Sequence, residues 1–217
     1  MDDISNRILD AAMDVFSKKG YEGATTRKIA KEANVNEVTL FRKFRSKENI
    51  LKTVIEQNQR KSIQTLDSIL LMEKSTQVQE CLLTLGMNIM KFLDERMDFI
   101  IMLIAEGRKR PEIAHNLASF LKKILKHLSE YFKEQIEKKT IRNVDPDIAA
   151  FNYLSYIFYS TFSKKICNES VLDDPEMKFK DFVDIFLRGT QNLEKPRQSE
   201  NFLSKEEFLK RSKFKGV

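Results

Sequence analysis

The chain has 217 residues, of which 41% are hydrophobic and 32% are charged, and it carries a formal net charge of +6. This composition is that of an ordinary globular protein, and the longest apolar run, FIIMLIA at 99–105, is far shorter than the roughly 20 residues that span a bilayer. Since the N-terminus also lacks the basic start and the continuous apolar core of a signal peptide, we expect a cytoplasmic protein without a membrane segment. Glycine and proline are few, 6 and 4, and helix-forming residues dominate, which predicts an all-α fold.

The first predicted helix spans about residues 4–19. Its apolar residues recur every three or four positions and form one stripe: Ile4, Ile8, Ala11, Ala12, Val15 and Phe16. Lys18 and Lys19 lie in the last turn, where positive charge suits the helix dipole, and Gly20 suits the position that follows a helix. We therefore expect this helix to end at Gly20.

Two short helices follow, joined by a turn of about three residues. Thr26 suits the N-cap of the first, RKIAKEA, and Asn36 suits the N-cap of the second, at 37–44. Asn34, between them, is one of the few residues besides glycine that tolerate the left-handed conformation of a tight turn, and Val35 is expected to enter the core. This spacing is typical of a helix-turn-helix.

The rest of the chain is expected to form larger helices, at about 47–71, 76–95, 97–108, 111–138, 145–165 and 176–194. The clearest start is at Asp145, an N-cap residue that Pro146 follows in the first turn. In the charged tail, 195–217, Ser204 and Glu207 form a capping box, so that a short helix and a frayed tail both remain open.

Residues 11–51 combine several motifs in one order. Gly, an aromatic residue and Thr-Thr follow the first helix, the second helix contains Ile-Ala-x-x-Ala, and the third carries Thr-Leu-aromatic-x-x-Phe before Ser-Lys-Glu. Together these motifs resemble the DNA-binding domain of the TetR (tetracycline-repressor) family of transcriptional regulators, whereas the remaining chain resembles the family only in its helical architecture. The resemblance implies a helix-turn-helix DNA-binding domain at 1–48 and a helical effector-binding and dimerisation domain at 49–217.

The chain departs from the family pattern at three positions. The family usually has Gly where Asn34 stands, and it often has Gly and Tyr where this chain has Val38 and Phe41. Val38 adds an apolar side chain to the recognition helix that suits a thymine methyl group. Phe41 has no hydroxyl group to donate to a phosphate, which puts one backbone contact in doubt.

The charge of the same segment favours DNA as the partner. Between Thr26 and Lys47 there are seven Lys or Arg against two acids. The early residues of a recognition helix face base edges, and cations beside it face phosphates. The predicted DNA contacts are Thr26, Arg27, Asn36, Glu37, Val38, Thr39, Phe41, Arg42, Lys43 and Lys47. The alternative is a three-helix bundle whose basic residues only face solvent.

Residues 148–162, IAAFNYLSYIFYSTF, are apolar or aromatic nearly all round a helical wheel, so both sides of this helix must be covered. The resemblance implies that the last two large helices form a four-helix dimer interface with a second copy. The expected interface residues are Phe158, Phe162, Phe179, Phe182, Val183, Phe186, Gly189 and Leu193. A core within one chain remains the alternative for any of these faces.

The resemblance also implies an effector pocket lined by the inner faces of the second domain. The 16 Phe, 5 Tyr and 8 Met of the chain favour an apolar or amphipathic small molecule. The expected lining residues, each of which also suits plain core, are Phe92, Phe99, Met102, Leu103, Phe120, Tyr153 and Tyr156. His115 and His127 stand apart, without a carboxylate or cysteine pattern, and are not expected to bind a metal ion.

The sequence contains no nucleophile elbow, phosphate loop, metal-ligand cluster or pair of catalytic carboxylates, so we expect neither an enzyme nor a cofactor. Cys81 and Cys167 lack a paired spacing and are expected to be free thiols. The prediction is a transcriptional regulator, expected to be a repressor, that binds a palindromic operator as a homodimer and is released by a small effector. The alternative is a non-specific architectural DNA-binding protein without an effector.

Overall fold

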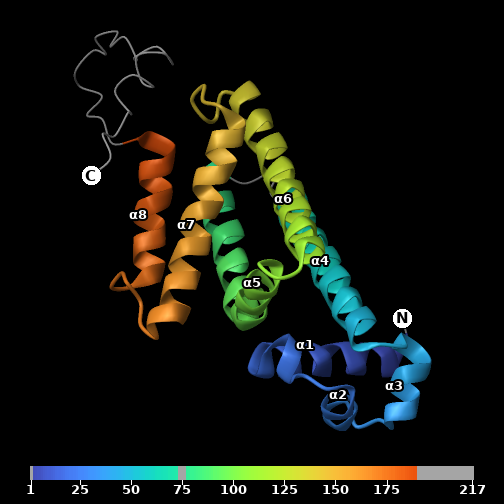
Figure 1. Ribbon diagram of the computed structural model, residues 1–217. Helices are drawn as coiled ribbons and strands as arrows, with labels where there is room; N and C mark the ends of the chain where they lie inside the picture. Colours follow the sequence, from blue (N-terminus) through green and yellow to red (C-terminus); the bar gives the residue numbers. More distant parts are fainter. Residues whose placement is uncertain (1, 73–76, 190–217) are drawn as a thin grey trace, which may run out of the picture. The chain divides into compact units, whose positions relative to one another are not determined.

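Eight α-helices and no strand are found in the residues that the structure, a computed structural model, describes, which are 2–72 and 77–189. The helices are α1 (Asp3–Gly23), α2 (Thr26–Glu32), α3 (Glu37–Phe44), α4 (Lys47–Met72), α5 (Val78–Gly107), α6 (Pro111–Glu137), α7 (Pro146–Cys167) and α8 (Pro175–Arg188) (Figure 1). The predicted all-α fold is confirmed. Residues 1–187 form one compact unit. None of the described helices is both long and apolar enough to cross a membrane.

The apolar stripe of α1 packs against α2, α4 and α5. Ile8, Ala12 and Phe16 are fully buried along it. Gly20 has a φ of 68°, in the left-handed region that favours glycine, so the regular helix stops at the predicted residue. A further turn continues to Gly23 and directs the chain into α2.

The turn between α2 and α3 has the predicted geometry. Asn34 has a φ of 51°, and Val35 packs against the core. The predicted N-cap of α2 is wrong by one residue. Thr25, whose backbone is extended, accepts a hydrogen bond from the Lys28 amide at 3.2 Å, and Thr26 is therefore the first residue inside the helix.

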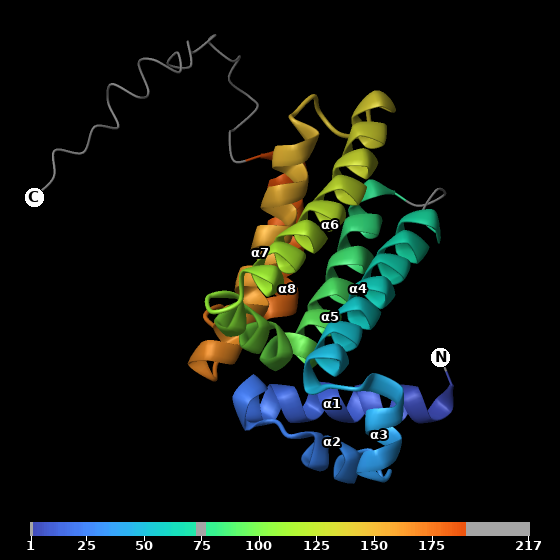
Figure 2. The same ribbon diagram turned by 45° about the vertical axis from the view of Figure 1, so that its right-hand side comes forward.

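The three N-terminal helices share their hydrophobic core with the helices that follow. Besides buried residues of α1–α3, this core contains Ile50, Leu51, Val54 and Ile55 of α4, Phe99, Met102 and Leu103 of α5, and Ile113 of α6. α1 consequently lies directly against α4 and α5, as both views show (Figures 1 and 2). The C-terminal part of α5 thus packs on α1 directly, without an intervening linker.

A second core lies among α4–α8 and is rich in aromatic rings. Phe132, Tyr153 and Phe179 are fully buried, and the Tyr153 ring centre lies 6.1 Å from that of Phe132 and 6.3 Å from that of Phe179. The Tyr153 hydroxyl donates to the Leu82 carbonyl, so its polar atom is satisfied inside the core. These rings hold α8 on the other helices.

α8 approaches α5 at Gly86. A Cβ atom added there would lie 2.0 Å from Phe179 Cζ and 2.8 Å from the Tyr153 hydroxyl oxygen. The missing side chain of Gly86 thus provides the space that the Phe179 ring occupies, which lets α8 approach α5 here.

Two predicted helix boundaries are wrong. The sequence predicts two helices with a break near residue 96, but α5 is one continuous helix. No Gly or Pro lies between residues 87 and 106, and Met97 is fully buried in helical register. α8 ends at Arg188 rather than at residue 194, because Gly189 adopts a φ of 80°. The predicted tail segment, 195–217, lies outside the described residues.

Candidate nucleic-acid interface

α3 is anchored by its inner face and presents its outer face to solvent. Leu40 and Phe44 are 0% and 7% exposed, so this face of α3 points into the core. Val38 and Phe41 are 72% and 44% exposed, and Arg42 is exposed beside them. The outer face therefore combines apolar and cationic side chains, which suit the thymine methyl groups and the phosphates of a DNA major groove.

Two hydrogen bonds fix the start of α3. The Asn36 side-chain oxygen accepts from the Val38 backbone amide at 2.9 Å, which confirms the predicted cap and leaves the side-chain NH₂ group of Asn36 as an exposed donor. The Thr26 hydroxyl donates to the Glu37 carboxylate at 2.6 Å and so links α2 to α3. Thr26 thus positions the recognition helix, on which Thr39 is half-buried.

The cations of this segment differ in how freely they can meet a phosphate. The Lys43 ammonium group forms an ion pair with the Asp2 carboxylate at 2.5 Å, and its hydrogen bond holds the pKa of Asp2 well below the usual range. A phosphate contact by Lys43 therefore competes with Asp2. Arg27 and Arg42 are exposed and form no ion pair with any described residue, so they are available to DNA.

Lys47 is engaged inside the protein. Its Nζ donates to the carbonyl oxygens of Tyr21 at 2.8 Å and Ala24 at 3.0 Å, and it lies 4.2 Å from the centre of the Tyr21 ring. These contacts hold the joint between α1 and α2 against the start of α4. A phosphate contact by Lys47, which stays a prediction, would therefore have to compete with these two carbonyl groups.

Replacing Lys47 by alanine is expected to destabilise the protein by about 1–3 kcal/mol, because two carbonyl groups lose a charged donor. Urea-induced unfolding measures the change, and Lys52→Ala, which removes an exposed lysine from the same helix, is the matched control. Equal stability of the two variants, together with weaker DNA binding by Lys47→Ala alone, would support the predicted phosphate contact of Lys47.

Comparison with known proteins identifies the family. The model of the "Bacterial regulatory proteins, tetR family" matches residues 8–54, and that of the "AefR-like transcriptional repressor, C-terminal domain" matches residues 80–189, about half of the chain. The chain belongs to the TetR family. The first match contains the whole helix-turn-helix and the second spans α5–α8, so this TetR protein is a DNA-binding transcriptional regulator, as the sequence predicts.

Named relatives extend over nearly the whole TetR protein. The HTH-type transcriptional regulator YvkB of Bacillus subtilis (strain 168) is 26% identical over 186 residues, which cover 85% of this chain and 96% of YvkB. IcaR of Staphylococcus aureus (strain Newman), the negative transcriptional regulator of the biofilm operon icaADBC, is 25% identical over 194 residues, which cover 85% of this chain and 100% of IcaR. Among solved structures, FadR from Bacillus subtilis in complex with stearoyl-CoA has the same fold, with a TM-score of 0.70 and 21% identity over 86% of this chain and 99% of FadR.

Val38 of this TetR protein is expected to contact thymine methyl groups. Uracil lacks this methyl group, so replacing a contacted thymine by uracil should weaken binding about fourfold per half-site. This factor corresponds to the free energy of burying one methylene-sized group, ~0.8 kcal/mol. Val38→Ala should bind the thymine and uracil duplexes equally, as measured by fluorescence anisotropy. Arg27→Ala, which removes an expected phosphate contact, is the control and should weaken both duplexes alike. A Val38→Ala variant that stays fully sensitive to uracil would exclude this contact.

The seven predicted effector residues do not line one cavity. Four of them lie in the two cores and are at most 7% exposed: Phe99, Met102, Leu103 and Tyr153. Tyr156 stacks on Phe182 with ring centres 4.0 Å apart, and Phe92 packs against the Arg96 guanidinium at 4.1 Å. Phe120 is the one of the seven that lines a described pocket. The sequence pattern could not separate core rings from pocket rings, because both recur with helical spacing.

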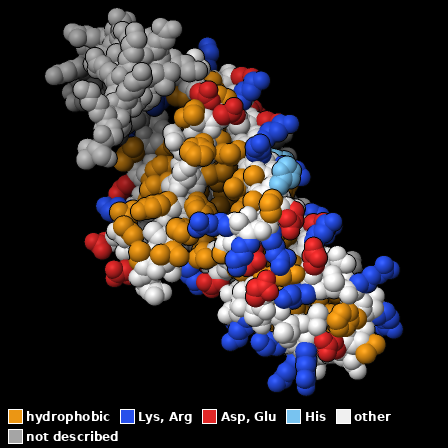
Figure 3. Space-filling view, viewed as in Figure 1, with side chains coloured by type: hydrophobic (Ala, Val, Ile, Leu, Met, Phe, Trp, Pro, Cys, Tyr) orange, Lys and Arg blue, Asp and Glu red, His pale blue; other side chains and the backbone are white. Residues whose placement is uncertain are grey.

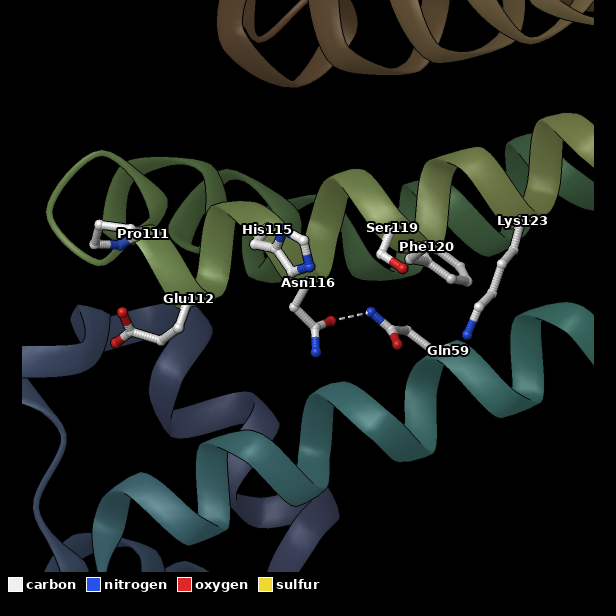
Figure 4. Close-up of a pocket in the computed structure, with 8 residues that line it drawn as sticks. All are labelled: Gln59, Pro111, Glu112, His115, Asn116, Ser119, Phe120 and Lys123. Carbon is white, nitrogen blue, oxygen red and sulfur yellow. Dashed lines mark hydrogen bonds between the residues drawn. The ribbon is translucent and has the colours of Figure 1, made fainter.

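Phe120 lines two adjoining grooves between α4 and α6, of about 460 and 470 Å³, and most of their lining side chains are polar. The lining of the first groove includes Gln59, His115, Asn116 and Lys123 (Figure 4). Gln59 of α4 donates to Asn116 of α6 at 2.5 Å across the groove. Within the described parts of the chain, no three His, Cys, Asp or Glu side chains gather as ligands of a metal ion. This polar lining differs from the predicted apolar effector pocket.

α7 is apolar on two opposite faces, as predicted. One face enters the second core, and the other leaves five large side chains at least 37% exposed: Ile148, Phe151, Phe158, Tyr159 and Ile166. α8 adds Met177 and Ile185, which are 52% and 50% exposed. Of these seven residues, Phe158 is the only one among the predicted interface residues, although the helical spacing of apolar residues along 148–166 indicated such a face.

Most of the predicted interface residues of α8 face inward instead. Phe179 and Val183 are fully buried, and Phe182 and Phe186 pack against the second core. Gly189 ends α8, and Leu193 lies outside the described residues. Phe162 is half-buried and stacks on Phe158 with ring centres 5.6 Å apart. The prediction failed for the inward residues because the most apolar face of α8 is taken by its own chain.

Proposed function

We propose that this TetR protein is a cytoplasmic repressor that binds a palindromic operator as a homodimer and is released from it by a small apolar or amphipathic effector. Residues 1–48 act as the DNA-binding domain, and residues 49–217 bind the effector and the second copy. The observation that carries the proposal is the outer face of α3, where Val38, Phe41 and Arg42 are exposed on a helix that the core anchors from within.

Homodimerisation is supported by the exposed apolar face of α7. Ile148, Phe151, Phe158 and Tyr159 lie on the side opposite the core, and Met177 and Ile185 of α8 are exposed as well. Exposed apolar side chains gathered on one face of a helix indicate an interaction site in a globular protein. A twofold-symmetric dimer would present two copies of α3 to half-sites one helical turn, roughly 34–36 Å, apart.

Release by an effector is supported by the direct packing of α1 on α4 and α5. A ligand that favours a different packing of α5 also favours a different placement of α1–α3. Such a ligand shifts the population away from the spacing of recognition helices that fits the operator. FadR, which has the same fold, was solved with stearoyl-CoA, an amphipathic molecule, and this supports the chemical class that we propose.

DNase footprinting on the DNA upstream of the protein's own gene tests the operator. We expect protection of two inverted half-sites and loss of the protection when a small-molecule extract supplies the effector. Salt titrations of operator and random duplexes test the alternative function. Equal affinities and equal salt slopes for the two duplexes would identify a non-specific architectural DNA-binding protein.

A further inference from the structure

An apolar hollow, the α5–α7 groove, lies between the C-terminal parts of α5 and α7. It has a volume of about 540 Å³ and is lined mainly by Ile101, Ile104, Phe162 and Ile166, with Arg108 and Lys109. Ile104 and Ile166 are 40% and 55% exposed, so apolar surface faces water here. Hydrophobic side chains gather over α7 and the neighbouring part of α5 in Figure 3, with Lys and Arg side chains beside them.

The charge of the α5–α7 groove is cationic and only partly compensated. Arg108 is exposed and has no ion-pair partner among the described residues. Lys109 Nζ lies 3.6 Å from Glu106 Oε1, and its side chain is 67% exposed. No carboxylate belongs to the lining, and both cations follow the last residue of α5, so they lie at one end of the groove.

We propose that the α5–α7 groove is the effector site and that it binds an amphipathic anion. The apolar chain of the ligand covers Ile104, Phe162 and Ile166, which removes their surface from water. Its carboxylate or phosphate group binds Arg108 and Lys109 with charge-assisted hydrogen bonds. This inference rests on the proposed function in one respect, that the protein responds to an effector.

The end of α5 connects the groove to the DNA-binding helices. The Glu106 carboxylate, 7% exposed, lies 3.6 Å from Lys109 Nζ and 3.5 Å from Arg110 Nε. Arg110 also lies 3.4 Å from Glu22 Oε1 and 3.9 Å from the centre of the Tyr21 ring, both at the end of α1. A ligand anion that draws Lys109 away leaves Arg110 as the main counter-charge of the buried Glu106. Arg110 then moves toward Glu106 and away from α1, which changes the placement of α1–α3.

A second copy of the chain is the competing occupant, because Ile166 belongs to the exposed apolar face of α7 and Phe162 stacks on Phe158 of that face. Covering the groove with an apolar protein surface would remove Arg108 from water without a counter-charge, which costs free energy. The cationic lining therefore favours a small anion over a second copy.

Isothermal titration calorimetry with decanoate tests the groove, with decyl phosphate as a second anion and decyltrimethylammonium as the cation of similar chain length. We expect both anions to bind and the cation not to bind. Arg108→Gln/Lys109→Gln should weaken decanoate binding about tenfold or more, the effect of losing one or more ion pairs. Ile166→Asp, which places a carboxylate in the groove, should weaken it as well. Lys122→Gln/Lys133→Gln, which removes two exposed lysines of α6, is the control and should leave binding unchanged.

Three results would overturn the assignment. The first is that the unaltered protein and Arg108→Gln/Lys109→Gln bind decanoate equally well. The second is that the anions and the cation bind equally well, and the third is that decanoate binds only after the homodimer is disrupted. Operator affinity with and without decanoate tests the coupling. Decanoate that binds but leaves operator affinity unchanged would disprove the role as effector site, whereas an unaltered protein that binds no operator would count against the proposed function alone.

Discussion

Gly86→Ala is expected to lower the free energy of unfolding by about 1–3 kcal/mol, and hence the Tm by roughly 2–4 °C per kcal/mol. The new Cβ atom would lie 2.0 Å from Phe179 Cζ, and the Phe179 ring is fully buried between α5 and α8. Either the ring leaves its preferred rotamer or α8 moves away from α5, and both lose packing in the second core. Thermal unfolding followed by circular dichroism measures the change.

Gly107→Ala is the matched control, because Gly107 also belongs to α5 and its added Cβ would meet Ala114 at 3.5 Å, an ordinary contact. This variant is expected to stay within about 1 kcal/mol of the unaltered protein, since alanine is favoured over glycine in helices. Combining Gly86→Ala with Phe179→Leu should recover part of the lost stability. Equal stability of the two alanine variants would mean that Phe179 does not occupy the space at Gly86.

Phe151→Asp is expected to separate the homodimer into monomers and to weaken operator binding about a hundredfold or more. Phe151 is 56% exposed on the outer face of α7. A carboxylate at this position would be buried without a counter-charge in an apolar interface. Monomers then bind the half-sites separately and lose the gain in affinity that comes from linking two binding sites. Analytical ultracentrifugation measures the assembly, and fluorescence anisotropy measures the operator affinity.

Leu121→Asp is the control for this experiment, because Leu121 is 50% exposed on α6, outside the proposed interface. It is expected to remain a homodimer with unchanged operator affinity. A Phe151→Asp variant that stays dimeric would move the interface away from α7. A monomeric variant with full operator affinity would show that operator binding does not require the homodimer.

Apart from the N-cap of α2, the helix-turn-helix could be predicted from the sequence because its determinants are local. Asn34 takes the left-handed conformation, Asn36 caps α3, and Leu40 and Phe44 point inward, each as its spacing indicates. The sequence was less informative where several partners compete for one side chain. Lys47 suits a phosphate by its position at the start of α4, but the carbonyl groups of Tyr21 and Ala24 hold it inside the protein.

The all-α class, the helix-turn-helix and the two-sided apolar character of α7 could be read from the sequence, because helical spacing and capping depend on residues a few positions apart. Which apolar face of each helix is buried depends on the folded chain, in which Phe179 and Val183 enter the core while Phe151 and Ile185 face outward. The contact between the end of α5 and α1 likewise depends on the folded chain. These outcomes depend on contacts between residues far apart in the chain, which periodicity within one helix does not encode.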